Sequence, residues 1–154
     1  MISANSAGVR FPPPLLYLIG LVAGILLGRL LPGTLPRTPL AVAVAVAFIL
    51  IGLPLMSFAR GLFLKRGTNV NPTRPSTVLV TDGPYRYTRN PMYVGVAAIY
   101  VGIALIFLSL WALILLVPIL IIIRYFVIAK EERYLLGVFG DEYRSFAHRV
   151  RRWI

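Results

Sequence analysis

Two apolar runs decide the fold of this chain: residues 91–107, PMYVGVAAIYVGIALIF, and residues 111–128, WALILLVPILIIIRYFVI. Three residues, LSL, separate them. As one helix the two runs would contain roughly 38 residues and measure about 57 Å, at 1.5 Å per residue. The hydrocarbon core of a bilayer is only about 30 Å thick. The runs therefore predict two membrane helices, about 91–108 and 110–128, joined by a tight hairpin.

Two further apolar runs come earlier in the chain. Residues 15–31 are near the lower length limit for a membrane span and too long for the apolar part of a signal peptide, so we expect a retained first helix. In residues 40–64 alanine and glycine recur, which would let another helix approach closely. Prolines and a glycine in residues 32–39 predict a turn between these helices. We expect an all-α integral membrane fold of about four transmembrane helices, in a single domain of residues 1–154.

The composition supports this fold and excludes several kinds of site. Hydrophobic residues make up 58% of the chain and charged residues 14%, and the mean hydropathy is +0.82, outside the usual range for soluble domains. The absence of cysteine excludes disulfides, thiolate metal sites and a cysteine nucleophile. His148 is the one histidine, so we expect no metal centre. The net charge of +11 comes from residues that flank apolar runs, which indicates anionic lipid headgroups rather than nucleic acid.

The polar residues gather in two segments, a loop over residues 65–90 and an amphipathic, helical tail over residues 129–154. Arginine and lysine are concentrated in both segments and are sparse in the turns between the other helix ends. Because loops rich in these residues stay in the cytoplasm, we expect both segments there. With four spans the N- and C-termini are then both cytoplasmic, in a membrane of the prokaryotic inner-membrane type.

The acidic residues all lie in these two segments, at Asp82, Glu131, Glu132, Asp141 and Glu142. Glu131 and Glu132 fall where the fourth helix would leave the bilayer. A carboxylate there could bind a cationic or hydroxyl-bearing ligand, because burial strengthens ionic hydrogen bonds. Spacing alone favours the alternative, a solvated helix start in which they pair with Lys130 and Arg133.

Residues 82–95, DGPYRYTRNPMYVG, are denser in polar and aromatic groups than a linker requires. Asn90 as a helix cap and Pro91 in the first turn would explain part of the pattern, since these residues begin helices well. The tyrosines could belong to an interfacial belt or could offer aromatic faces to a cationic ligand. Arg86 and Arg89 could contact phosphate headgroups.

Four short motifs occur in order: GPY at residues 83–85, RNPMYVG at 89–95, EE at 131–132 and FGDEY at 139–143. Together they resemble the isoprenylcysteine carboxyl methyltransferase and phospholipid methyltransferase family of integral membrane enzymes. The resemblance covers roughly residues 70–146. Each motif alone is weakly specific, but their combination in this order is much more so.

The resemblance implies a cofactor site for S-adenosylmethionine, with S-adenosylhomocysteine as product, formed between the loop and the C-terminal amphipathic helix. The residues implied to bind the cofactor are Thr77, Val78, Leu79, Val80, Tyr85, Asn90 and Glu131. Arg89 and Glu132 would lie beside them as catalytic residues. Many members of the family carry histidine at the position of Asn90, and asparagine keeps the hydrogen bonds but cannot titrate.

The expected function is therefore an S-adenosylmethionine-dependent methyltransferase that acts on a lipid-soluble or amphipathic acceptor at the cytoplasmic membrane face. Its partners would be membrane lipids and a lipid-like substrate, with no nucleic acid and no obligatory protein partner. The alternative is a non-enzymatic membrane scaffold that binds anionic lipid or a partner protein. A transporter ranks last, because it needs an ionisable group deep in a span and Arg124 lies near a helix end, where it can snorkel.

Overall fold

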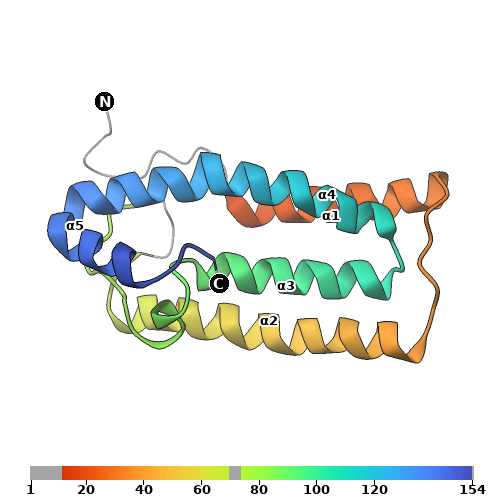
Figure 1. Ribbon diagram of the computed structural model, residues 1–154, viewed down its shortest axis with the longest axis horizontal. Helices are drawn as coiled ribbons and strands as arrows, with labels where there is room; N and C mark the ends of the chain where they lie inside the picture. The colour runs from red at the N-terminus through yellow and green to blue at the C-terminus, as the bar shows by residue number, and fades with distance from the viewer. Residues whose placement is uncertain (1–11, 70–73, 154) are drawn as a thin grey trace.

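The computed structural model describes residues 12–69 and 74–153, which fold mainly as helices (Figure 1). The long helices are α1 (Pro13–Leu30), α2 (Pro39–Lys65), α3 (Pro91–Ile106), α4 (Leu110–Ile122) and α5 (Ala129–Arg149). A short 3₁₀ helix, η1 (Gly83–Arg86), and a π-helical turn, η2 (Ile123–Ile128), complete the fold. Residues 1–11, 70–73 and 154, which belong to the expected domain, loop and tail, lie outside the described residues.

The helices have the length and composition of membrane helices. Three of them could cross a bilayer, namely α1, α2 and the continuous helix Leu110–Arg149, and α3 is a shorter apolar helix. Large apolar side chains such as Leu18, Leu50 and Val117 are exposed on their outer faces. Such a surface suits lipid rather than water. The described residues contain no β-strand, so the expected all-α membrane fold is confirmed.

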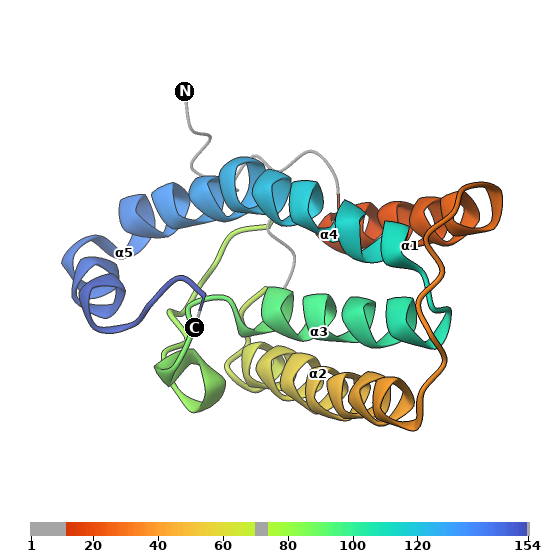
Figure 2. The same ribbon diagram turned by 45° about the vertical axis from the view of Figure 1, so that its right-hand side comes forward.

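The helices pack as two close pairs, α1 with α4 and α2 with α3 (Figures 1 and 2). Glycines allow the close approach within each pair. A Cβ atom on Gly52 of α2 would lie 2.7 Å from the carbonyl oxygen of Gly95 on α3. A Cβ atom on Gly24 of α1 would overlap the backbone of Ala112 on α4. Small residues at helix interfaces are typical of membrane bundles, where van der Waals packing drives association.

A tight turn joins α3 to α4, as the two apolar runs predicted. Leu108 adopts a positive φ of 53°, and Ser109 then caps α4 by accepting a hydrogen bond of 3.2 Å from the amide of Ala112. The Ser109 hydroxyl also donates a hydrogen bond of 2.8 Å to the carbonyl oxygen of Gly24. One side chain therefore both starts α4 and fixes it to α1.

At the opposite end of the bundle the tail is helical at its start, as expected. The backbone stays helical from α4 through η2 into α5, so Glu131 and Glu132 extend from a helix that continues the fourth span. The break comes later, at Gly140, whose φ of 52° reverses the direction of α5. The second half of α5 then turns back toward α3, and residues 150–153 lie beside the start of α3 (Figures 1 and 2).

The loop and the tail pack together at this end, and we call the described part of residues 66–90 and 129–153 the cap. Its apolar centre consists of Val80, Tyr85, Tyr143 and Phe146, which pack with Ala59 of α2 and are all buried. Segments far apart in the sequence thus share one small core. That core fixes the polar residues described next.

Candidate functional site

Tyr85 anchors the loop side of the cap. Its amide donates a hydrogen bond of 3.2 Å to the carbonyl oxygen of Asp82, which closes η1. Its ring lies 5.5 Å from the ring of Phe63, and only 4% of the side chain is exposed. The Tyr85 hydroxyl is buried and has no hydrogen-bond partner within the described residues.

Glu131 occupies the tail side of the same region. The hydroxyl of Tyr93, in the first turn of α3, donates a hydrogen bond of 2.7 Å to Oε1 of Glu131. Burial raises the pKa of Glu131, the Tyr93 hydrogen bond lowers it, and the Glu132 charge raises it, so that the resulting pKa is about 7. Burial raises the pKa of Tyr85 as well, and the nearby Glu131 charge contributes to that increase. At neutral pH the Glu131 carboxyl is therefore near the midpoint of its titration.

A third tyrosine completes this group from α1. Tyr17 is 3% exposed, and its hydroxyl also lacks a hydrogen-bond partner within the described residues. Tyr17 belongs to the buried apolar cluster against which Tyr93 packs. Buried polar groups in folded proteins are almost always hydrogen-bonded, and those that are not call for an explanation such as a bound ligand or water. The tyrosine group, Tyr17, Tyr85 and Tyr93 with Glu131, therefore has the character of a ligand site.

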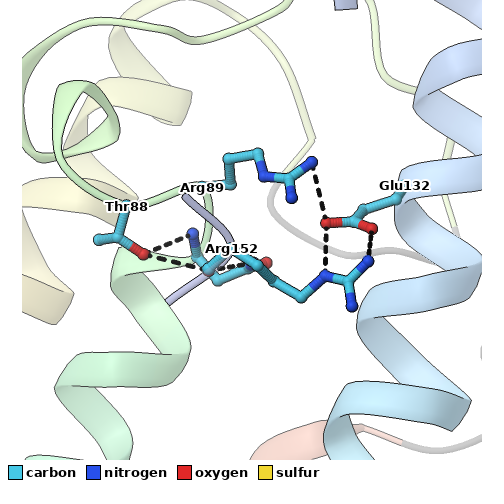
Figure 3. A network of polar contacts seen from close by, with 5 residues as sticks. Thr88, Arg89, Glu132 and Arg152 are labelled. Carbon is cyan, nitrogen blue, oxygen red and sulfur yellow. Dashed lines mark hydrogen bonds and ion pairs between the residues drawn. The ribbon is translucent and has the colours of Figure 1, made fainter. Parts of the chain in front are cut away.

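Glu132 lies beside this group and is held by two arginines (Figure 3). Arg152 donates from Nε to Oε1 at 3.0 Å and from Nη2 to Oε2, a bidentate pair. Nη1 of Arg89 lies 3.3 Å from Oε1 of the same carboxylate. Burial and the Glu132 charge raise the pKa of Tyr143 to about 12, although Arg89 and Arg152 partly oppose this increase. The pairs are poorly exposed, so their charges are weakly screened.

The end of the chain holds the residues that precede α3. The amide of Arg89 donates a hydrogen bond of 2.9 Å to the carbonyl oxygen of Arg151. The carbonyl oxygen of Arg152 accepts from Oγ1 of Thr88 at 3.3 Å and from Nδ2 of Asn90 at 2.9 Å. Asn90 stands at the cap position of α3, but its side chain makes no capping hydrogen bond. The predicted positions of Asn90 at the N-cap and of Pro91 in the first turn are therefore confirmed, but the expected side-chain capping hydrogen bond is not formed.

The structure brings some of the sequence-predicted site residues together and leaves others apart. Glu131 and Tyr85 interact electrostatically, and Arg89 pairs with Glu132. Val80 is buried with Tyr85, and Leu79 packs on the same core. Thr77 and Val78 are exposed, and Thr77 instead bonds within the loop, its amide donating to Oγ1 of Thr68 at 3.1 Å. Asn90 is directed to the chain end rather than to Glu131.

Three residues that contribute to this geometry were not among the predicted site residues. Tyr93 belongs to the RNPMYVG motif, but its sequence position also fits an interfacial belt. Tyr17 lies in the first apolar run, where nothing marks one polar hydroxyl as buried. Arg152 is one of several arginines near the chain end, and only the folded structure distinguishes it from its neighbours by its pairing with Glu132. The usable signal was the position of Tyr93 within a motif that already contained Arg89 and Asn90.

Residues 40–142 match the model of the phospholipid methyltransferase family. The chain belongs to this family. The match extends from α2 through the first part of α5 and ends before Arg152. The matched region therefore includes Tyr85, Arg89, Tyr93, Glu131 and Glu132. The resemblance seen in the four motifs is thereby confirmed.

A second comparison is local. Over 35 residues the chain is 51% identical to an uncharacterized protein of Haemophilus influenzae, which is 23% of this chain and 56% of that protein. The chain thus spans little more than half of the length of this curated relative. No solved structure matches the chain.

Proposed function

We propose that the protein transfers a methyl group from S-adenosylmethionine to a lipid-soluble or amphipathic acceptor, at the end of the bundle where the cap lies. The observation that carries the proposal is the group formed by the part-buried pair Glu131 and Tyr93 and the buried, unpartnered hydroxyl of Tyr85. This group lies inside the region that matches the family. The enzyme is favoured over the scaffold because a scaffold requires no buried, unpartnered polar groups.

The residues present fit the cofactor. S-adenosylmethionine carries a sulfonium, an ammonium, a carboxylate and ribose hydroxyls, and when bound it supplies an electrophilic methyl group. The Glu131 carboxylate would bind a cationic part of it, and the Tyr85 ring would pack against it. The Tyr85 and Tyr17 hydroxyls have free hydrogen-bonding capacity for its polar atoms. Leu79 and Val80 would contribute apolar contact, and Thr77, Val78 and Asn90 would line the site at its outer edge.

The chain's own contribution to the reaction would be to hold donor and acceptor in position and to exclude water from the site. Methyl transfer is an in-line displacement, so holding donor and acceptor in line supplies much of the rate. Arg89 would orient an anionic acceptor or headgroup, because its planar guanidinium matches carboxylate and phosphate oxygens. Glu132 would fix the direction of Arg89. The apolar core of the cap would exclude water.

The basic residues of the cap support an orientation in the membrane. Arg66, Arg86 and Arg149 are exposed on the cap, which favours its location on the cytoplasmic side. We propose that residues 1–154 form one membrane domain, with both termini cytoplasmic, in a membrane of the prokaryotic inner-membrane type. A lipid-like acceptor would then reach the site laterally from the bilayer, and the cofactor would reach it from the cytoplasm.

The test is a transfer assay with methyl-labelled S-adenosylmethionine against fractionated membrane lipids, using purified protein in detergent. We expect label in one lipid fraction, and loss of most of it in Glu131→Gln. Glu142→Gln is the matched control, because Glu142 is exposed on the same helix and should leave transfer unchanged. Absence of label in every fraction, together with no calorimetric binding of S-adenosylhomocysteine, would reject the enzyme and favour the scaffold.

A further inference from the structure

Glu132 has more positive charge around it than it can balance. Two guanidinium groups, Arg89 and Arg152, face this one carboxylate. Arg152 takes both carboxylate oxygens. Arg89 shares only Oε1, through Nη1 at 3.3 Å. The three side chains together therefore carry a net charge of +1 and are poorly exposed. Because Arg152 binds both carboxylate oxygens, the unbalanced charge belongs chiefly to Arg89.

Arg89 also has an unused hydrogen-bond donor. Its Nε is buried and has no partner within the described residues. A guanidinium carries five N–H donors in a fixed plane, and a buried donor without an acceptor costs free energy. An excess positive charge beside an unused buried donor favours an anionic oxygen group as ligand.

The chain end fixes this arrangement from a second direction. The carbonyl oxygens of Arg151 and Arg152 accept hydrogen bonds from residues 88–90, the segment that carries Arg89. Trp153 packs against the core that contains Tyr17 and Tyr93. The segment 150–153 therefore joins the start of α3, the first turn of α5 and the tyrosine group.

We propose that Arg152 is a positioning residue for the site described above. By binding Glu132 through both carboxylate oxygens, it prevents Glu132 from neutralising Arg89, and Arg89 stays free to bind an anionic oxygen group. That group is either the carboxylate at the amino-acid end of the cofactor or the phosphate of a lipid headgroup. The proposal rests on the proposed function for the identity of the cofactor and concerns a residue outside the segment that matches the family.

A neutral residue at position 152 reverses the charge balance. In Arg152→Gln, Glu132 retains only Arg89 as an ionic partner and binds it more closely, so Arg89 loses its free charge. In the double variant Arg152→Gln with Glu132→Gln no carboxylate remains at position 132, and Arg89 is free again. In Arg152→Lys one ammonium keeps part of the ion pair, but not its bidentate geometry.

The experiment is isothermal titration calorimetry on the purified full chain in detergent, with two pairs of ligands. S-adenosylhomocysteine is paired with 5′-methylthioadenosine, which lacks the amino-acid end. A short-chain phosphatidic acid is paired with the matching diacylglycerol, which lacks the phosphate. Arg151→Gln is the control, because the Arg151 side chain is exposed and only its backbone carbonyl contacts Arg89.

We expect Arg152→Gln to weaken binding of the anionic member of one pair about tenfold and to change binding of its uncharged partner less than about twofold. The ligand pair in which only the anionic member binds more weakly identifies the anion that Arg89 binds. Arg152→Lys should recover part of the loss and the double variant most of it, whereas Arg151→Gln should bind like the wild type. A merely structural role would weaken both members of each pair alike and would gain nothing from the second substitution.

Two results would overturn the proposal: equal losses within both pairs, or no loss in either. If the wild type binds S-adenosylhomocysteine normally in either case, the proposed function stands and only the role of Arg152 falls. If the wild type binds neither S-adenosylhomocysteine nor the phosphatidic acid, both proposals fall together.

Discussion

The hydroxyl of Tyr93 lies 2.7 Å from Oε1 of Glu131 and joins the first turn of α3 to the first turn of α5. A phenol that donates to a carboxylate stabilises the charged form, whereas burial destabilises it. Here burial is the larger effect, and the pKa of Glu131 is raised to about 7. The bond therefore tunes a carboxyl whose charge changes within the physiological pH range.

The first prediction concerns the pH dependence of cofactor binding. A carboxyl is charged above its pKa, so attraction to a cationic ligand is present above about pH 7 and is lost as the pH falls through that value. We expect the affinity of the wild type for S-adenosylhomocysteine to fall by about tenfold per pH unit below the midpoint. Glu131→Gln should bind weakly at every pH between 5.5 and 8.5. Calorimetry at four pH values measures both profiles.

Glu142→Gln is the control for this series and should keep the wild-type profile, because Glu142 is exposed. A pH-independent affinity in the wild type would contradict the assignment of the cation to Glu131.

The second prediction concerns the hydrogen bond between Tyr93 and Glu131. Tyr93→Phe deletes the donor that lowers the pKa of Glu131, so the pKa should rise above its value of about 7. The midpoint of the affinity profile should then move to higher pH, while the affinity at pH 8.5 changes little. Tyr87→Phe tests whether loss of any nearby hydroxyl has this effect, since Tyr87 is 79% exposed. A midpoint that stays in place, or moves to lower pH, would show that the bond does not stabilise the carboxylate.

The sequence predicted the membrane helices because their signal is local. Four apolar runs with glycine and proline at their ends suffice to predict an all-α membrane protein. The motifs similarly pointed to Glu131 and Arg89, because each motif is a short contiguous string. Tyr85 was identified in the same way.

The remaining geometry depends on contacts between distant segments. Arg152 reaches Glu132 only because Gly140, at a φ of 52°, reverses α5. Nothing in the sequence near Arg152 distinguishes it from Arg149 or Arg151. Asn90 is similar, since its position before Pro91 fits a helix cap and only the folded structure shows that its side-chain amide donates to the carbonyl oxygen of Arg152.

The third prediction concerns the start of α4. Ser109 is 3% exposed, accepts from the amide of Ala112 and donates to the carbonyl of Gly24. Ser109→Ala removes both bonds and should lower the free energy of unfolding by about 1–2 kcal/mol. Thr38→Ala removes a cap of α2 that is exposed to solvent, so a smaller loss, about 0.5–1 kcal/mol, is expected there. Thermal unfolding in detergent, followed by tryptophan fluorescence, compares the two. Equal losses would mean that the contact with α1 contributes nothing.

The last prediction tests the packing of α2 against α3. Gly52→Ala places a Cβ atom 2.7 Å from the carbonyl oxygen of Gly95. This steric clash involves a backbone atom, so it can be relieved only if the two helices move apart. We expect a destabilisation of about 1–3 kcal/mol, the usual cost of overpacking. Gly61→Ala is the matched control on the same helix, because nothing lies within 4 Å of the added atom. That variant should be neutral or up to about 1 kcal/mol more stable, since alanine is the better helix former. If both substitutions stabilise the protein alike, α2 and α3 do not pack through Gly52 and Gly95. Thermal unfolding of the two variants side by side therefore decides whether this close helix pair exists in the membrane protein.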